Sequence, residues 1–211
     1  RRDRGRDDVR GRRHGLRDGD RGAPGLTTGA ARRRHYIPRI PHDLAADLEL
    51  ALALTDIADA ITMARFGARD LVVHAKPDRT PVTEADHAVE AALREELARA
   101  RPDDGILGEE LGVTGSGQRR WIVDPIDGTK SFLRGAPPWA TLLALEVERV
   151  VVLGVVSAPA LGRRWWAARG SGAFVNGTVV HVSAVERLDD ALLCHADVRS
   201  YEQRGCGPQF D

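Results

Sequence analysis

The sequence predicts an α+β fold, in which helices and strands form separate layers around one core. Two segments with apolar residues at helical spacing, 43–67 and 83–101, come first, and short apolar or β-branched runs follow between residues 106 and 182. The two kinds of element do not alternate strictly, which argues against repeated βαβ units. With 211 residues, 42% of them hydrophobic, the chain can bury one substantial core.

Residues 1–42 differ in composition from the rest of the chain. They hold 13 Arg and 5 Asp, net +8, and because the whole chain is formally neutral, the remaining residues carry −8. With almost no apolar side chain before Leu26, we expect a disordered Arg/Asp/Gly-rich extension. Clustered Arg could bind nucleic acid, but this mixture is also typical of an upstream extension from a mistaken start site, which we favour. We therefore place one domain at 43–211 and expect no nucleic-acid partner.

The first helix is predicted from Asp43 to about Gly67, since glycine often closes a helix. Its apolar side chains form two adjoining faces, made by Leu44, Leu48 and Leu52 and by Leu50, Leu54, Ile57 and Ile61. Leu71–Val73 reads as a short strand, and 76–78 as a polar loop. Thr83 with Asp86 three residues later resembles a capping box, so a second helix is predicted from there to near Arg101.

The strands are predicted from short apolar runs between turn residues. The runs are Ile106-Leu107, Trp121–Val123, Trp139–Val147, Val150–Ser157, Arg164–Ala168, Ala173–Val175, Thr178–Val182 and Ala191–Cys194. A glycine-rich loop is expected at 112–117, a tight connection at Glu148-Arg149, and a type I′ hairpin turn at Asn176-Gly177. Strand alternation places the rings of Trp165 and Trp166 on opposite sheet faces, where we expect them to pack.

The segment Asp124-Pro125-Ile126-Asp127-Gly128-Thr129 carries the clearest chemical signal. It follows an apolar strand and places one carboxylate on each side of a carbonyl. Pro125 should stiffen the turn. Carboxylate and carbonyl oxygens are the ligands that Mg²⁺ prefers. Gly128 and Thr129 then offer backbone N–H groups to a phosphate at a helix start. The same pattern is also common in plain surface turns.

A second strand end supplies further carboxylates. Glu109 and Glu110 follow the apolar pair Ile106-Leu107, so they could converge on the ions held by the first motif. Together the two strand ends predict metal-assisted hydrolysis of a phosphate ester.

These motifs resemble a known family. Pro81-Val82-Thr83-Glu84-Ala85-Asp86, Gly108-Glu109-Glu110 and Asp124–Thr129 follow in the order of the three-part signature of the inositol monophosphatase family, Mg²⁺-dependent and lithium-sensitive phosphatases. The stretches 130–142 and 157–170 further resemble the actinobacterial-type histidinol-phosphatases. The similarity runs from about Asp43 to about Asp197, and it implies a layered αβαβα sugar-phosphatase-like fold.

The resemblance implies a role for each site residue. Glu109, Asp124, Asp127 and the Ile126 carbonyl would bind two Mg²⁺ ions, for which Mn²⁺ can substitute, and Asp86 would assist a third. Glu109 with Thr129 would take the proton of the attacking water and orient it, while Gly128, Thr129 and Lys130 would bind the phosphate. Glu110 would support the ligands, and Lys76 would lie near the third ion. Asp86 could instead merely cap its helix, and Lys76 could be a solvated loop cation.

The implied substrate is a small phosphomonoester. Through the subfamily resemblance, Arg134, Trp139 and Arg163-Arg164 favour histidinol phosphate, whose hydrolysis to histidinol belongs to histidine biosynthesis. Inositol 1-phosphate or a related small phosphate is the alternative. The family often forms dimers, so a homodimer stays open.

The chain departs from the family after Asp197. Family members continue through a region with a Trp-Asp motif whose Asp binds the second metal, and no Trp-Asp pair occurs here. The chain therefore resembles a version of the fold that is incomplete at its C-terminus, and we expect it to be a poor or dead phosphatase. A catalytically impaired binding protein and a non-functional fragment are the competing hypotheses.

Cellular location is predicted from what the sequence lacks. Cys194 and Cys206 are too few and too loosely spaced for a disulfide framework or a zinc site. No run approaches the roughly 18 apolar residues of a membrane span, and the arginine-rich start lacks the apolar part of a secretory signal. We expect a cytoplasmic protein with no membrane partner.

Overall fold

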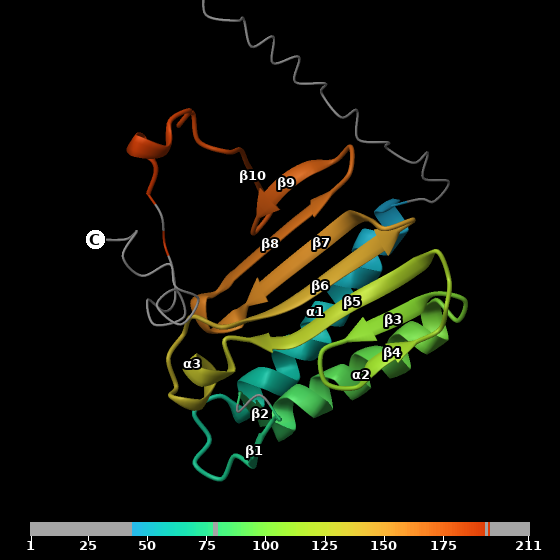
Figure 1. Cartoon of the computed structure of the whole chain (residues 1–211), viewed down its shortest axis with the longest axis vertical. Helices are drawn as coiled ribbons and strands as arrows, with labels where there is room; N and C mark the ends of the chain where they lie inside the picture. The colour runs from blue at the N-terminus through green and yellow to red at the C-terminus, as the bar shows by residue number, and fades with distance from the viewer. Residues whose placement is uncertain (1–43, 78–79, 193, 195–211) are drawn as a thin grey trace, which may run out of the picture. The chain divides into compact units, whose positions relative to one another are not determined.

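An eight-stranded mixed sheet with two helices on one face organises the domain (Figure 1). The computed structural model describes residues 44–77, 80–192 and 194, so the predictions for residues 1–42 and for the chain after Cys194 lie outside the described residues. A helix layer packed on a mixed sheet confirms the predicted α+β class.

The order of the strands across the sheet is β10-β9-β8-β7-β6-β5-β3-β4. Their bounds are β3 (Gly105–Gly108), β4 (Gly112–Thr114), β5 (Arg119–Asp127), β6 (Ala140–Val147), β7 (Val150–Ala158), β8 (Arg163–Ala168), β9 (Gly172–Val175) and β10 (Thr178–Val180). All neighbouring strands are antiparallel except β3 and β5, which run parallel. The parallel pair directs the residues after both strands to one edge of the sheet.

Three α-helices and a small hairpin complete the described part of the chain. The helices are α1 (Leu44–Arg65), α2 (Glu84–Ala100) and α3 (Thr129–Leu133), and short 3₁₀ turns lie at η1 (Pro159–Leu161) and η2 (Leu188–Asp190). The hairpin pairs β1 (Val73–Ala75) with β2 (Pro81–Thr83). None of the helices in the described residues has the length and hydrophobicity that a transmembrane segment needs.

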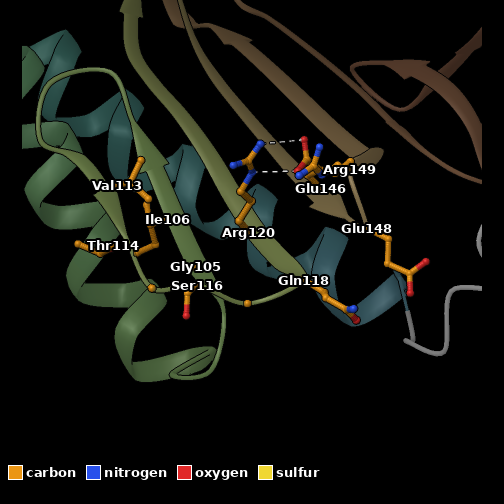
Figure 2. Close-up of a pocket in the computed structure, with 12 residues that line it drawn as sticks. Gly105, Ile106, Val113, Thr114, Ser116, Gln118, Arg120, Glu146, Glu148 and Arg149 are labelled. Atoms are coloured by element: carbon orange, nitrogen blue, oxygen red, sulfur yellow. Dashed lines mark hydrogen bonds and ion pairs between the residues drawn. The ribbon is translucent and has the colours of Figure 1, made fainter.

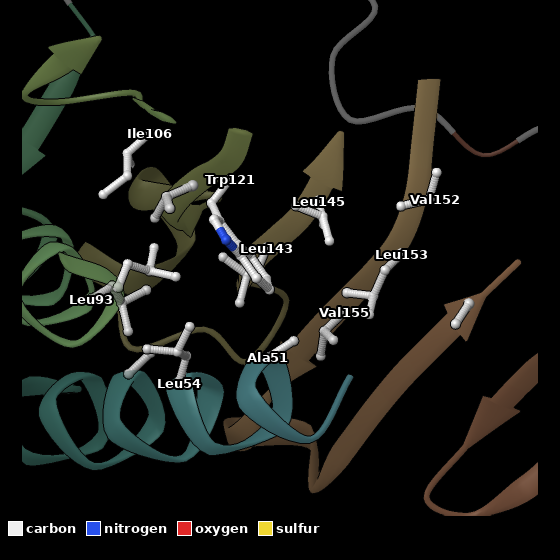
Figure 3. Close-up of a cluster of buried hydrophobic side chains, with 14 of the residues drawn as sticks. Ala51, Leu54, Leu93, Ile106, Trp121, Leu143, Leu145, Val152, Leu153 and Val155 are labelled. Carbon is white, nitrogen blue, oxygen red and sulfur yellow. The ribbon is translucent and has the colours of Figure 1, made fainter. Parts of the chain in front are cut away.

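The core lies between the sheet and the helix pair α1–α2 (Figure 3). Leu54 of α1 and Leu93 of α2 meet the inward side chains of the central strands, which include Trp121, Leu143, Leu145, Leu153 and Val155. Alternation along β8 places Trp166 on this face, stacked on Phe174 at 5.7 Å, and Trp165 on the other, as predicted. That other face is apolar and hollowed by a cavity of about 510 Å³.

Local sequence signals account for the helix start and the tight turns. Thr83 caps α2 through the predicted reciprocal hydrogen bonds with Asp86. Glu148 and Arg149 have φ values of 50° and 66°, and Asn176 and Gly177 have 47° and 82°, the left-handed pairs of two-residue hairpin turns. Both predicted hairpin connections are confirmed.

Several predicted boundaries were wrong. The strand expected at Leu71–Val73 begins at Val73 and pairs with a strand that starts at Pro81, where a missing N–H is tolerated. The loop expected at 112–117 contains β4, because pairing with β3 stabilises Gly112–Thr114 in an extended form. Ala191, Leu192 and Cys194 are not in a strand, and residue 193 lies outside the described residues.

Candidate active site

The parallel strands β3 and β5 bring the two predicted carboxylate motifs to one sheet edge. Gly108 pairs with Val123, so Glu109 and Asp124 are the next residues on adjacent strands. The backbone N–H of Glu109 donates to the Val123 carbonyl oxygen at 3.1 Å, which extends the pairing one step beyond β3. The convergence of the two strand ends is thus a direct result of the parallel register.

Strand β5 continues through the aspartate motif instead of ending before it. Its pairing with β6 shifts register between Asp124 and Asp127, and Pro125 lies inside this irregularity. The expectation that Pro125 stiffens a turn was therefore wrong. A proline lacks the N–H needed for a regular ladder, so it is tolerated where the strand bulges. The bulge presents Asp124 and Asp127 at the edge with Ile126 buried between them.

Gly128 links this strand to α3. Its φ of +88° is left-handed, and a Cβ there would lie 3.0 Å from the Pro138 carbonyl oxygen. A side chain would be disfavoured by both conformation and space. Beneath the link, Phe132 and Trp139 meet edge to face at 5.0 Å, and Ile126 belongs to the same buried cluster. This aromatic support fixes where α3 begins, as the sequence predicted.

Thr129 and the Ile126 carbonyl, predicted separately for the site, lie together. The Thr129 hydroxyl donates a hydrogen bond of 3.1 Å to that carbonyl oxygen. A carbonyl oxygen has two lone pairs, so this bond is compatible with a second interaction there. Asp127, Gly128 and Lys130 are exposed around the same link.

Asp124 lies among other carboxylates. Burial, followed by the charge of Glu109 and a hydrogen bond with it, raises the pKa of Asp124 from 3.8 to about 8, and the charges of Asp127 and Asp86 act in the same direction. Its buried Oδ1 has no hydrogen-bond partner. A hard divalent cation would offset the repulsion among these carboxylates and coordinate the oxygen that has no partner. The donor set therefore fits Mg²⁺.

Lys76 supplies a cation at this edge. Its Nζ lies 2.7 Å from a carboxylate oxygen of Glu109 and 2.7 Å from one of Glu110. Burial alone would lower the pKa of Lys76, but its hydrogen bonds to the two glutamates outweigh burial and raise it. The reading of Lys76 as a merely solvated loop cation was wrong.

Asp86 is buried in the first turn of α2. Its Oδ2 accepts hydrogen bonds from the Thr83 N–H at 2.8 Å and the Thr83 hydroxyl at 2.6 Å, so it does cap the helix. Burial raises the pKa of Asp86 against the effect of these bonds, and the charge of Glu110 adds to the rise. Asp86 therefore combines a capping role with a place in the electrostatic field of the site.

The predicted ligands gather but do not enclose an ion. Among the residues that the structure describes, no three His, Cys, Asp or Glu side chains stand in an arrangement that would hold a metal. The ammonium of Lys76 pairs with Glu109 and Glu110 instead. The ligand assignment of Glu109, Asp124, Asp127 and Ile126 therefore stays a prediction.

Two buried residues that support the site were missed by the sequence reasoning. Thr141 on β6 donates to the Pro125 carbonyl oxygen at 2.8 Å. Glu90 on α2 is fully buried and accepts the backbone N–H groups of Glu110 and Leu111. Glu90 stands four residues after Asp86 beside the apolar stripe of its helix, and an acidic residue there was an overlooked signal.

The residues expected to favour histidinol phosphate differ in burial. Trp139 is buried in the aromatic cluster under α3. Arg164 pairs with Asp56 and Asp59 of α1, which ties β8 to the helix layer. Arg134 and Arg163 are exposed. Trp139 and Arg164 thus have packing and ion-pairing contacts of their own, and the substrate preference they favour stays a prediction.

A sizeable cavity among the described residues lies away from the carboxylates. It has a volume of about 850 Å³ and lies at the opposite ends of β3 and β5, where Arg120 pairs with Glu146 at 2.9 Å (Figure 2). Two arginines and two glutamates line this cavity, and Arg120 pairs with Glu146 there. We place the candidate site at the carboxylate cluster because the chemically matched residues converge there.

Comparison with known proteins gives consistent results. Residues 43–205 match the inositol monophosphatase family. The chain is 52% identical over 172 residues to a histidinol-phosphatase from Streptomyces coelicolor, covering 77% of this chain and 65% of the relative. It is 55% identical over 171 residues to a histidinol-phosphatase from Mycobacterium tuberculosis, covering 78% and 65%. The chain thus spans about 65% of the length of these relatives.

Solved structures show the same fold. An inositol monophosphatase from Zymomonas mobilis superposes with a TM-score of 0.66 at 36% identity, covering 78% of this chain and 63% of that one. The extragenic suppressor protein suhB from Bartonella henselae gives a TM-score of 0.65 at 37% identity, covering 68% and 57%.

Proposed function

Because the chain belongs to the inositol monophosphatase family, we propose that it carries the cation- and phosphate-binding residues of a phosphomonoesterase that converts histidinol phosphate to histidinol. The observation that carries this proposal is the position of Asp124. Its half-buried carboxylate has one buried oxygen without a hydrogen-bond partner and lies in the field of Glu109, Asp127 and Asp86. Carboxylates so placed gain most from a shared divalent cation.

We assign the cation to Asp124, Asp127, Glu109 and the Ile126 carbonyl, with Asp86 near a further ion. Mg²⁺ is the expected ion and Mn²⁺ a substitute, since both favour oxygen ligands. When bound, such an ion would polarise the phosphate and lower the pKa of a nearby water.

The chain's own residues would bind the ester and handle the proton. The backbone N–H groups of Gly128 and Thr129, with the Lys130 ammonium, would bind phosphate oxygens and stabilise the negative charge of the transition state. The Glu109 carboxylate would accept the proton of the attacking water. The Thr129 hydroxyl, held on the Ile126 carbonyl, would orient that water through a lone pair.

Histidinol phosphate is the preferred substrate because two histidinol-phosphatases match at 52% and 55% identity. An inositol-1-monophosphatase from Rhizobium meliloti matches at 43% over 127 residues, so inositol 1-phosphate is the second candidate.

Phosphate release tests the proposal. Initial rates on histidinol phosphate and inositol 1-phosphate would be measured with saturating Mg²⁺ and again with a chelator, beside the Streptomyces enzyme. We expect Mg²⁺-dependent release that is faster from histidinol phosphate. Faster release from inositol 1-phosphate would make inositol 1-phosphate the assigned substrate in place of histidinol phosphate. If the rates on both substrates equal those measured with the chelator, the proposed enzymatic activity is refuted and a non-catalytic protein is supported.

A further inference from the structure

We infer that Glu90 is a positioning residue of the candidate site. Glu90 holds the turn after β3 so that Glu109 faces Asp124. The role of Glu109 in this inference rests on the proposed function. The positioning role of Glu90 itself follows from the contacts around the turn. Glu90 lies one helical turn after Asp86 on α2, and its side chain is fully buried.

The turn between β3 and β4 is held on both sides. On one side the Glu109 N–H donates to the Val123 carbonyl oxygen of β5. On the other, the N–H groups of Glu110 and Leu111 donate to the two carboxylate oxygens of Glu90 at 2.7 and 3.0 Å. Three consecutive N–H groups are thus bound, which ties the backbone at Glu109 to β5 and α2 together.

Arg94 completes this anchor. Its Nε donates to the Glu90 carboxylate at 2.9 Å, and Nη1 donates to the Thr114 hydroxyl at 3.0 Å. Arg94 also donates to the Gly112 carbonyl oxygen. The guanidinium therefore neutralises the buried carboxylate and binds the strand that leaves the turn.

Gly108 allows the carboxylate to approach. A Cβ at this position would lie 1.8 Å from Glu90 Oε1 and 2.7 Å from Oε2. Glu90 and Gly108 are thus sterically coupled, because any larger residue at position 108 would displace the carboxylate.

Glu90→Gln tests the inference without a change in side-chain size. The amide offers one acceptor oxygen and turns an NH₂ group toward a second N–H donor, so one anchoring bond is lost. In the cation-free protein we expect the amides of Glu110 and Leu111 to exchange hydrogen about tenfold faster or more, since a charge-assisted bond is removed. Amides of β6 and β7 should keep their protection. The inference would be overturned if hydrogen exchange at Glu110 and Leu111 were unchanged, or if amides across the whole sheet lost protection equally.

Cation affinity gives the second readout. Mn²⁺ binding, followed by electron paramagnetic resonance, should weaken by roughly 10–100-fold in Glu90→Gln, as when a group that orients a ligand is removed. Glu95→Gln, on the exposed side of the same helix, is the matched control and should bind as the wild type does. Equal affinity in Glu90→Gln and the control would contradict the inference.

Two further variants separate position from charge and from folding. Glu90→Asp keeps the negative charge but is too short to reach both N–H groups, so it should behave like Glu90→Gln. Wild-type behaviour of Glu90→Asp would show that only charge matters and overturn the inference. Gly108→Ala, which keeps every charge, should also speed exchange at Glu110 and Leu111, and it serves if Glu90→Gln does not fold.

The two proposals fail in different ways. A wild-type chain that takes up no Mn²⁺ refutes the proposed function, and exchange at Glu110 and Leu111 then decides the inference on the anchor. Normal Mn²⁺ uptake with unchanged affinity in Glu90→Gln refutes the positioning role alone.

Discussion

The hydroxyl of Thr141 donates a hydrogen bond of 2.8 Å to the carbonyl oxygen of Pro125. Thr141 is fully buried on β6, opposite the irregular stretch of β5 that carries Asp124 and Asp127. The regular ladder is interrupted at Pro125, so a side chain satisfies a carbonyl that backbone pairing does not. This contact fixes the bulge that sets the spacing of the two aspartates.

Thr141→Val should destabilise the protein by about 1–3 kcal/mol, because it leaves the Pro125 carbonyl buried without its donor while keeping the side-chain volume. Chemical denaturation measures the free energy of unfolding. Thr178→Val, on the exposed edge strand β10, is the matched control and should change it by less than about 0.5 kcal/mol. Equal stabilities of the two variants would show that the Thr141 contact does not support the bulge.

Asp127→Asn should reduce Mg²⁺-dependent phosphate release to the background rate and leave the melting temperature unchanged. The side chain is exposed, so its neutral near-isostere costs the fold little, but a proposed cation ligand loses its charge. Asp103→Asn, also exposed, controls for the loss of one surface charge. Undiminished release in Asp127→Asn would exclude this carboxylate as a necessary ligand.

The cation-free protein should become less stable as pH rises from about 4 to about 8. Folding raises the pKa of Asp124 from 3.8 to about 8, so in this range the native state binds the proton more tightly than the unfolded chain does. Stability is then greatest below the lower pKa and falls until the upper one is passed. Denaturation of the wild type and of Asp124→Asn across this range measures the effect. A wild-type profile with the same slope as the variant would contradict it.

Lys76→Met should bind Mg²⁺ several-fold more tightly than the wild type. The ammonium now pairs with Glu109 and Glu110, so an incoming cation must displace it and overcome its repulsion. Calorimetric titration measures the affinity, and Arg69→Met controls for the loss of one exposed positive charge. Weaker binding in Lys76→Met would mean that the lysine assists the cation.

Local sequence signals predicted much of the fold because they depend on neighbouring residues. The Thr83 cap, the Asn176-Gly177 turn and the apolar spacing of α1 each require only a few adjacent side chains. Strand β4 was missed because its extended form depends on pairing with β3, which the glycine-rich sequence at 112–117 does not indicate. The parallel pairing of β3 and β5, on which the site depends, was anticipated only as a convergence of strand ends.

The supporting residues of the site could not be read from the sequence in the same way. Thr141 lies 16 residues from Pro125, and Glu90 lies 20 from Glu110, so both contacts depend on tertiary packing. The motif identified the carboxylates, but the bulge at Pro125 and the pairing of Lys76 with Glu109 arise from how distant elements meet.

Anomalous scattering from crystals grown with Mn²⁺ would show whether the carboxylates hold a cation. We expect an anomalous peak bounded by the carboxylates of Glu109, Asp124 and Asp127, with the Lys76 ammonium displaced from Glu109. Absence of a peak between these side chains at saturating Mn²⁺, or a peak only elsewhere on the protein, would contradict this expectation.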